Sequence, residues 1–156
     1  MDSLIWLYAR IVVNVVLFVL DLMGIKVSLS KIAMSRTIGK AFEFLGMNPE
    51  AKAAITKFIL AFKTAWEKND ASEMAKCIYQ IMKDLQAGGL LWMIIESVVS
   101  EMSKWDWFMT AVGVSLNITA MLATEGFALI AKMAGAVLSA KNLIDLVLEA
   151  FKRSGL

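Results

Sequence analysis

Few residues in this chain have the types and spacing that catalysis requires. Glu96 and Glu101 are close enough in sequence to form a general acid–base pair, but nothing nearby would orient them. Cys77 lies on an apolar helical face, and we interpret it as a buried structural thiol rather than a nucleophile. The chain has no histidine, which excludes histidine-ligated metals and every Ser-His or Cys-His nucleophile. We therefore predict a non-enzymatic protein without catalytic residues, a metal or a cofactor.

The composition points instead to lipid or to an apolar partner. Hydrophobic residues make up 59% of the 156 residues and charged residues 19%, whereas soluble domains are about 45–50% apolar and about 25% charged. Sixteen Lys and Arg against 14 Asp and Glu are too evenly balanced to indicate nucleic-acid binding. The single cysteine excludes an internal disulfide. The length fits one domain over residues 1–156.

The most informative segment is a run of 18 uncharged residues from Trp107 to Thr124, about the minimum length that spans a bilayer. A turn at Glu125-Gly126 follows it. The next segment, Phe127 to Ala140, is apolar except for Lys132, and we expect its helix to continue to Lys152. These patterns predict a hydrophobic C-terminal helical hairpin over about 107–152.

We predict that this hairpin inserts into a membrane or is embedded in one. Small residues recur on both arms and would let the two helices approach closely, as helices do in lipid. Tryptophans at the start of the run would lie at the membrane–water boundary. The same pattern also suits a tightly packed hairpin in a permanently soluble core. The expected apolar-contact residues are Trp105, Trp107, Phe108, Gly113, Leu116, Met121, Phe127, Ile130, Gly135 and Leu138.

A basic amphipathic helix is expected over about 29–45. Lys31, Arg36 and Lys40 share its polar face, and basic amphipathic helices often lie on anionic membranes. We therefore assign these three residues as candidate ligands of lipid headgroups. The alternative is that they form an ordinary solvated face.

The first apolar segment, about 4–25, has three possible interpretations. Ser3, Arg10, Asn14 and Asp21 form a thin polar stripe on an otherwise apolar helix. Such a helix is either buried in a core, with Arg10 and Asp21 reaching outward, or embedded in a membrane with its stripe facing protein. A cleaved signal peptide is the third possibility, although the basic n-region is missing.

Three further helices complete a predicted all-α, single-domain, compact bundle of about six helices. Amphipathic helices are expected over about 49–68 and 71–87, because capping residues precede both and Gly88-Gly89 ends the second. A short apolar helix is expected over about 90–103. The order of elements, amphipathic helices around a hydrophobic hairpin, resembles that of colicin-type pore domains and of the death-regulator helical bundles. No motif matches either residue by residue, so the resemblance implies no site residues.

The leading functional hypothesis is a small membrane-active or membrane-associated protein with a lipid membrane as its partner. It would be peripheral or integral to that membrane, and otherwise cytoplasmic. One alternative is a soluble bundle that binds an apolar small molecule in its interior, because such pockets are mostly apolar. Another is an assembly subunit, for example a homo-oligomer, that uses apolar surface as a protein interface.

Overall fold

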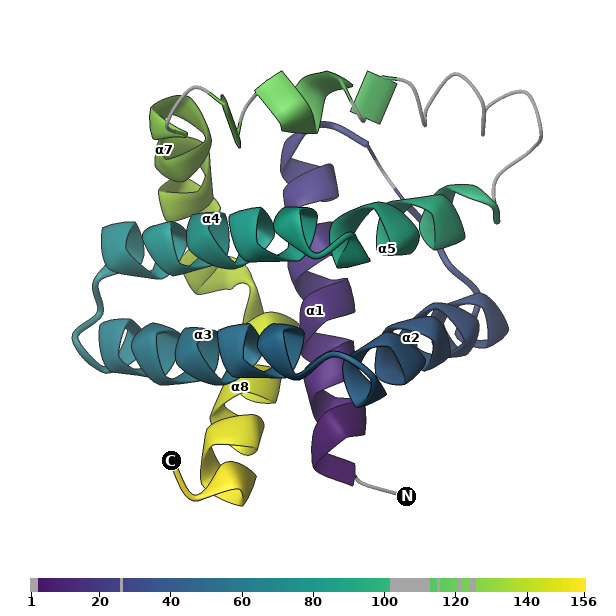
Figure 1. The fold of residues 1–156 in the computed structure, drawn as a ribbon. Coiled ribbons are helices and arrows are strands. Elements are labelled where there is room, and N and C mark those ends of the chain that lie inside the picture. The colour runs from purple at the N-terminus through teal and green to yellow at the C-terminus, as the bar shows by residue number, and fades with distance from the viewer. Residues whose placement is uncertain (1–2, 26, 102–112, 115, 121, 124–125) are drawn as a thin grey trace.

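The computed structural model describes residues 3–25, 27–101, 113–114, 116–120, 122–123 and 126–156 (Figure 1). Within these ranges the regular structure is helical and contains no strand, so the all-α prediction is confirmed. The elements are α1 (Ser3–Leu22), α2 (Lys31–Gly46), α3 (Pro49–Glu67), α4 (Ala71–Ala87), α5 (Leu90–Val99), α7 (Phe127–Ala136), the 3₁₀ turn η1 (Val137–Ser139) and α8 (Lys141–Ser154).

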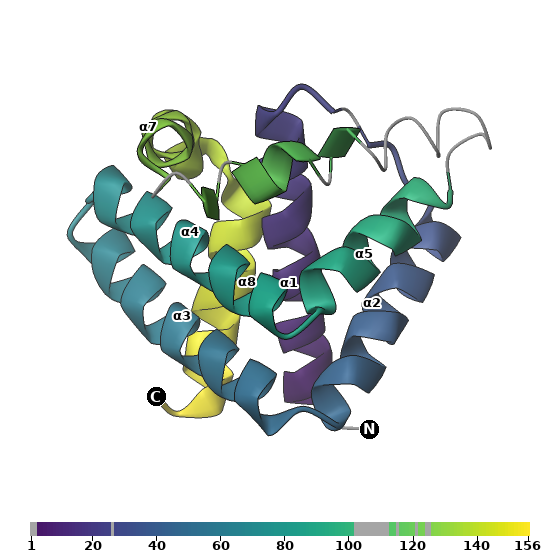
Figure 2. The same cartoon turned by 45° about the horizontal axis from the view of Figure 1, so that its top comes forward.

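Helix α1 lies at the centre of the bundle. It packs mainly against α2 and α8 and also touches α3, α4, α5 and α7, and Figure 2 shows these helices around it. Burial on several sides follows from its sequence, because its β-branched valines between Val12 and Val19 are all inaccessible to water. Arg10 and Asp21 are exposed. This arrangement is the first of the three interpretations of the segment, a core helix with its charges directed outward.

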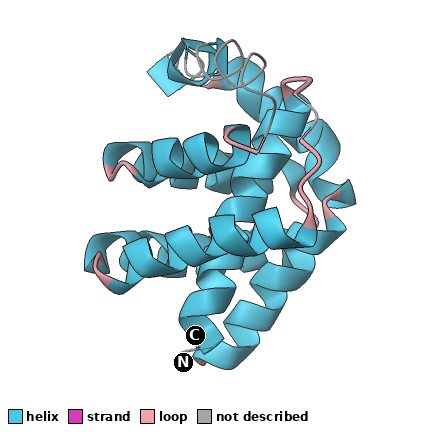
Figure 3. Ribbon diagram, turned by 90° about the vertical axis from the view of Figure 1, so that its right-hand side faces the viewer, coloured by secondary structure: helices cyan, strands magenta, loops and turns pink. Residues whose placement is uncertain are grey.

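Two helical layers cross each other. In Figure 1, α3 and α4 run across the direction of α1 and α8. The side view in Figure 3 shows helices and loops and no strand among the described residues. The caps of this layer lie where the sequence signals indicate. The Ala51 amide donates to the Asn48 side chain at 3.2 Å, and the Glu73 amide donates to the Asp70 carboxylate at 3.1 Å. The two helices pack against each other, and α3 also packs against α8 and α1 while α4 packs against α7, α5 and α1.

The predicted second arm of the hairpin is wrong as a single helix. It breaks at η1, and the segments Phe127–Ser139 and Lys141–Ser154 meet at 79°. The physical reason is packing, because α7 lies against α4 while α8 lies against α1 and α3. A straight helix could not reach both surfaces. The predicted total of about six helices is also too low, since the described residues contain seven α-helices with described bounds, one 3₁₀ turn and further helical residues between 113 and 123.

The first arm of the hairpin is described only in part. Residues 113–114, 116–120 and 122–123 are helical, and the remainder of 102–125 lies outside the described residues. By length and composition, α1 is the one described helix that passes as a candidate membrane span, or one of two if the bent pair from 127 to 154 is counted together. A buried core helix has the same length and composition, so this finding is weak evidence for a span.

Candidate functional site

The described residues between 113 and 139 form a surface that we call the apolar layer. In Figure 1 its helical residues before Gly126 lie along the top of the molecule, in green, and α7 descends from the upper left. The 3₁₀ turn η1 follows α7 in the chain. Its inward side chains are buried and recur every four residues, both before Gly126 and after it. These side chains are Val114, Ile118, Leu122, Leu129, Met133 and Val137. One side of the layer is therefore part of the hydrophobic core.

The outward side of the apolar layer is unusually poor in charge. Leu116 is 67% exposed, Phe127 is 74% exposed and Leu138 is 46% exposed. The other exposed residues of the layer are alanines, Gly135, Lys132 and the uncharged polar residues Asn117, Thr119 and Ser139. Lys132 is the one charged residue among those that the structure describes from 113 to 139. By contrast, the exposed side of α8 carries Lys, Asp and Arg, as expected of a helix that faces water.

The structure places the predicted apolar-contact residues in three groups. Leu116, Phe127, Gly135 and Leu138 are exposed on the apolar layer, and Gly113 and Ile130 are half-buried in it. Trp105, Trp107, Phe108 and Met121 lie outside the described residues. The expected close packing of the two arms does not occur at Gly113 or Gly135, because a Cβ atom at either position would meet nothing within 4 Å.

The glycine that does make a close contact is Gly126, at the turn between the two halves of the apolar layer. Its φ of +72° lies in the left-handed region, and a Cβ atom there would overlap the ring of Tyr79 on α4. The same tyrosine donates a hydrogen bond of 2.9 Å from its hydroxyl to the carbonyl oxygen of Leu122. The sequence indicates a turn at Gly126 but contains no signal that identifies Tyr79 as its partner.

The three candidate headgroup ligands lie on α2, and one of them is paired with an acid. Lys31, Arg36 and Lys40 are all exposed. The Arg36 guanidinium donates to both carboxylate oxygens of Glu101, at 2.9 and 3.1 Å. Sequence reasoning missed this pairing, which joins residues 65 positions apart. Because Glu101 neutralises Arg36, we retain Lys31 and Lys40 as the stronger candidates for contact with anionic lipid.

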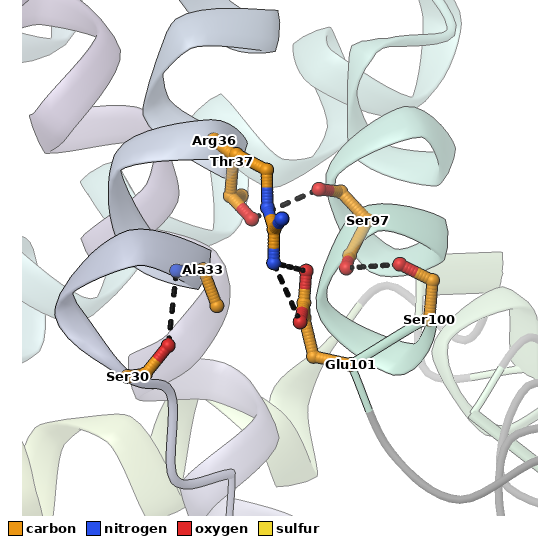
Figure 4. A network of polar contacts seen from close by, with 7 residues as sticks. All are labelled: Ser30, Ala33, Arg36, Thr37, Ser97, Ser100 and Glu101. Carbon is orange, nitrogen blue, oxygen red and sulfur yellow. Dashed lines mark hydrogen bonds and ion pairs between the residues drawn. The ribbon is translucent and has the colours of Figure 1, made fainter.

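Figure 4 shows how this pairing belongs to a wider junction between α2 and the end of α5. Beneath Arg36, the hydroxyls of Thr37 and Ser97 share a hydrogen bond of 2.8 Å. Both side chains are buried, so each satisfies the other away from water. Ser30 caps α2 by accepting from the Ala33 amide at 3.1 Å.

Helix α2 and the apolar layer occupy different parts of the molecule. Helix α2 packs against α1 and α5, whereas α7 packs against α4. In Figures 1 and 2, α5 lies between α2 and the helical residues before Gly126. The basic residues and the outward apolar residues are therefore separate candidate surfaces.

A small, mainly apolar groove opens at the surface between α3 and α4. It has a volume of about 280 Å³, and its apolar lining includes Phe58, Cys77 and Ile81. Small-molecule pockets are typically about 300–1,000 Å³, so the groove is at the lower limit. Burial raises the pKa of the Cys77 thiol to about 11, and the charge of Glu73 acts in the same direction. A thiol with a raised pKa is a poor nucleophile at neutral pH.

A groove of about 450 Å³ with a mixed polar and apolar lining lies between α1, α2 and α8. Arg10 and Asn14 from the polar stripe of α1 line it, together with Asp145 and Glu149 of α8. Two of the four residues of the stripe thus line an open groove. Among the described residues, no group of three or more Cys, Asp or Glu side chains could hold a metal ion.

The fold and its surfaces define an all-α bundle that is built around one buried apolar helix and carries on its outside a layer with one charged residue, Lys132, among its described residues. No family model matches the chain, and neither a curated protein nor a solved structure shows significant similarity to it.

Proposed function

We propose that this protein is a non-enzymatic, membrane-associated protein that contacts lipid through the outward side of the apolar layer. One observation carries the proposal: large apolar side chains project outward from 113–139 while Lys132 is the one charge among the described residues of that segment. Water-facing helices carry a polar face, and exposed apolar patches mark sites of interaction. The bilayer interface accepts such a surface without any enzymatic chemistry.

The free energy available is sufficient for this role. Transfer of apolar surface out of water contributes about 25 cal/mol per Å², so a few hundred Å² provide several kcal/mol. Leu116, Phe127 and Leu138 are the largest described contributors. The bundle remains folded in this mode, because these three side chains are not part of the core. Lys31 and Lys40 would add electrostatic attraction to anionic lipid.

The proposal is tested by placing charges on the apolar layer. We expect the double substitution Leu116→Glu and Phe127→Glu to weaken flotation with neutral phosphatidylcholine vesicles by about tenfold or more, since both side chains lose favourable transfer from water. The matched control is the double substitution Met47→Glu and Leu60→Glu, at positions that are 81% and 47% exposed outside the layer. The control adds the same charge and should float like the parent protein.

Far-UV circular dichroism of all variants checks that the helical fold is intact. Equal flotation of the layer variant and the parent would overturn the proposal. An equal loss in the layer variant and the control would also overturn it, because binding would then depend on overall charge.

A further inference from the structure

The turn of the apolar layer is held on α4 by one aromatic side chain. Tyr79 is only 9% exposed, and its hydroxyl donates to the Leu122 carbonyl oxygen within the protein interior. Its ring lies directly against Gly126, at a distance that no side chain at position 126 could share. Tyr79 therefore makes two contacts here, a hydrogen bond to Leu122 before the turn and a ring contact with Gly126 at the turn. We call this pair of contacts the Tyr79 latch.

The latch differs in kind from the other contacts that hold the apolar layer. Val114, Ile118, Leu129 and Met133 bury apolar surface, and lipid tails can replace that burial because the hydrophobic effect has no directional requirement. The hydrogen bond from Tyr79 is directional. Between the described residues of the layer and α4, it is the one hydrogen bond that the structure contains.

Lipid cannot replace this bond. The hydrocarbon region of a bilayer offers no donor to a backbone carbonyl, so the hydrogen bond from Tyr79 is lost without compensation by lipid when the layer leaves α4. The tight contact at Gly126 would open in the same movement. The latch therefore favours the docked layer, whereas the apolar contacts are nearly indifferent between protein and lipid.

We propose that the Tyr79 latch controls a conformational step in which the apolar layer detaches from α4 and enters the bilayer. This inference rests on the proposed membrane function and adds a second, deeper state to it. In the first state the outward side of the layer touches lipid. In the second state the inward side does so as well.

The test removes the hydroxyl with Tyr79→Phe and compares it with Tyr8→Phe. Tyr8 is the other tyrosine of the chain, and its hydroxyl lies 3.4 Å from Thr56 Oγ1, between α1 and α3. Both substitutions remove one hydroxyl, but only the first touches the apolar layer. Loss of one buried hydrogen bond shifts an equilibrium by about fivefold. We expect Tyr79→Phe to accelerate amide hydrogen exchange in 113–139 by about that factor in vesicle-free buffer.

Flotation with phosphatidylcholine vesicles provides the second measurement. We expect Tyr79→Phe to raise the vesicle-bound fraction relative to free protein by about fivefold, and Tyr8→Phe to leave it unchanged. Gly126→Ala should act in the same direction as Tyr79→Phe, because its Cβ atom would overlap the ring.

The outcomes separate this inference from the proposed function. If the parent protein does not float, the membrane function itself is wrong. If the parent floats but both tyrosine variants behave alike in exchange and flotation, the latch is overturned and membrane contact stands. If Tyr79→Phe opens the layer in buffer without raising flotation, detachment does not control membrane entry, and the inference is again overturned.

Discussion

Cys77 is the residue whose ionisation the fold changes most clearly. Its pKa of about 11, against 9.0 for an unperturbed cysteine, leaves roughly a hundredfold less thiolate at pH 8. We expect iodoacetamide to alkylate Cys77 about two orders of magnitude more slowly in the folded protein than in concentrated urea. Mass spectrometry of the intact protein over time measures both rates. Similar rates in the two conditions would show that the thiol is freely accessible.

The same pKa shift has a consequence for stability at alkaline pH. The folded state holds the thiol proton more tightly than the unfolded chain does, so the contribution is complete below about pH 9 and is lost as the pH rises toward about 11. The free energy of unfolding should therefore fall more steeply between pH 8 and pH 10.5 in the parent than in Cys77→Ala. Urea denaturation at both pH values measures the difference, and lysine and tyrosine titrations cancel in the comparison. Parallel pH profiles would contradict the shift.

At the scale of helices, α2 and α5 depend on one buried polar pair, Thr37 and Ser97. Thr37→Val should destabilise the fold by about 1–3 kcal/mol, because the Ser97 hydroxyl would lose its partner away from water. The double variant Thr37→Val and Ser97→Ala removes both hydroxyls and should recover much of that loss. Urea denaturation of the two single variants and the double variant forms a complete cycle. Strictly additive effects would mean that the hydroxyls do not interact.

The sequence predicts some helices far better than others, for identifiable reasons. Helices α3 and α4 each have a capping side chain and a periodic apolar face, which are encoded in the helix and in the residues next to it. The break between α7 and α8 has no proline, and the reason for it is tertiary. One half packs on α4 and the other on α1 and α3. The local periodicity of apolar residues contains no information about which helix each half packs against.

In the candidate site, too, some features can be predicted from the local sequence and others depend on tertiary contacts. The low charge of the apolar layer is visible in the sequence, because it depends on composition alone. The pairing of Arg36 with Glu101 and the contact of Tyr79 with Gly126 are not visible, because each joins residues more than forty positions apart. Only the fold brings these partners together. The prediction from the sequence that Arg36 binds lipid headgroups therefore did not take Glu101 into account.

For the molecule as a whole, the charges of α2 and the apolar layer should contribute separately to membrane binding. Each basic residue near an anionic surface is worth about 1 kcal/mol, so Lys31→Gln with Lys40→Gln should weaken binding to phosphatidylglycerol vesicles by about tenfold or more at low salt. Binding to phosphatidylcholine vesicles should stay the same. The control, Arg36→Gln with Glu101→Gln, leaves the net charge unchanged and removes a pair that is already neutral.

Salt provides an independent check on this prediction. Raising the ionic strength from 0.1 M to 1 M shortens the Debye length from about 10 Å to about 3 Å, so the difference between the lysine variant and the parent should disappear. A difference that persists at high salt would mean that the lysines act through packing. A lysine variant that binds like the parent at low salt would mean that the basic side of α2 is simply solvated.

The central position of α1 also has a consequence during translation, because the helices that bury α1 all follow it in the chain. Helix α1 is synthesised before every helix that covers it, and α8, one of its main neighbours, follows about 120 residues later. At typical elongation rates of about 5–20 residues per second, this interval is on the order of ten seconds. Throughout it, a helix with the length and hydropathy of a membrane anchor lacks part of its cover. The nascent chain therefore presents this apolar segment to the ribosome surface, to chaperones and to targeting factors well before the bundle can enclose it.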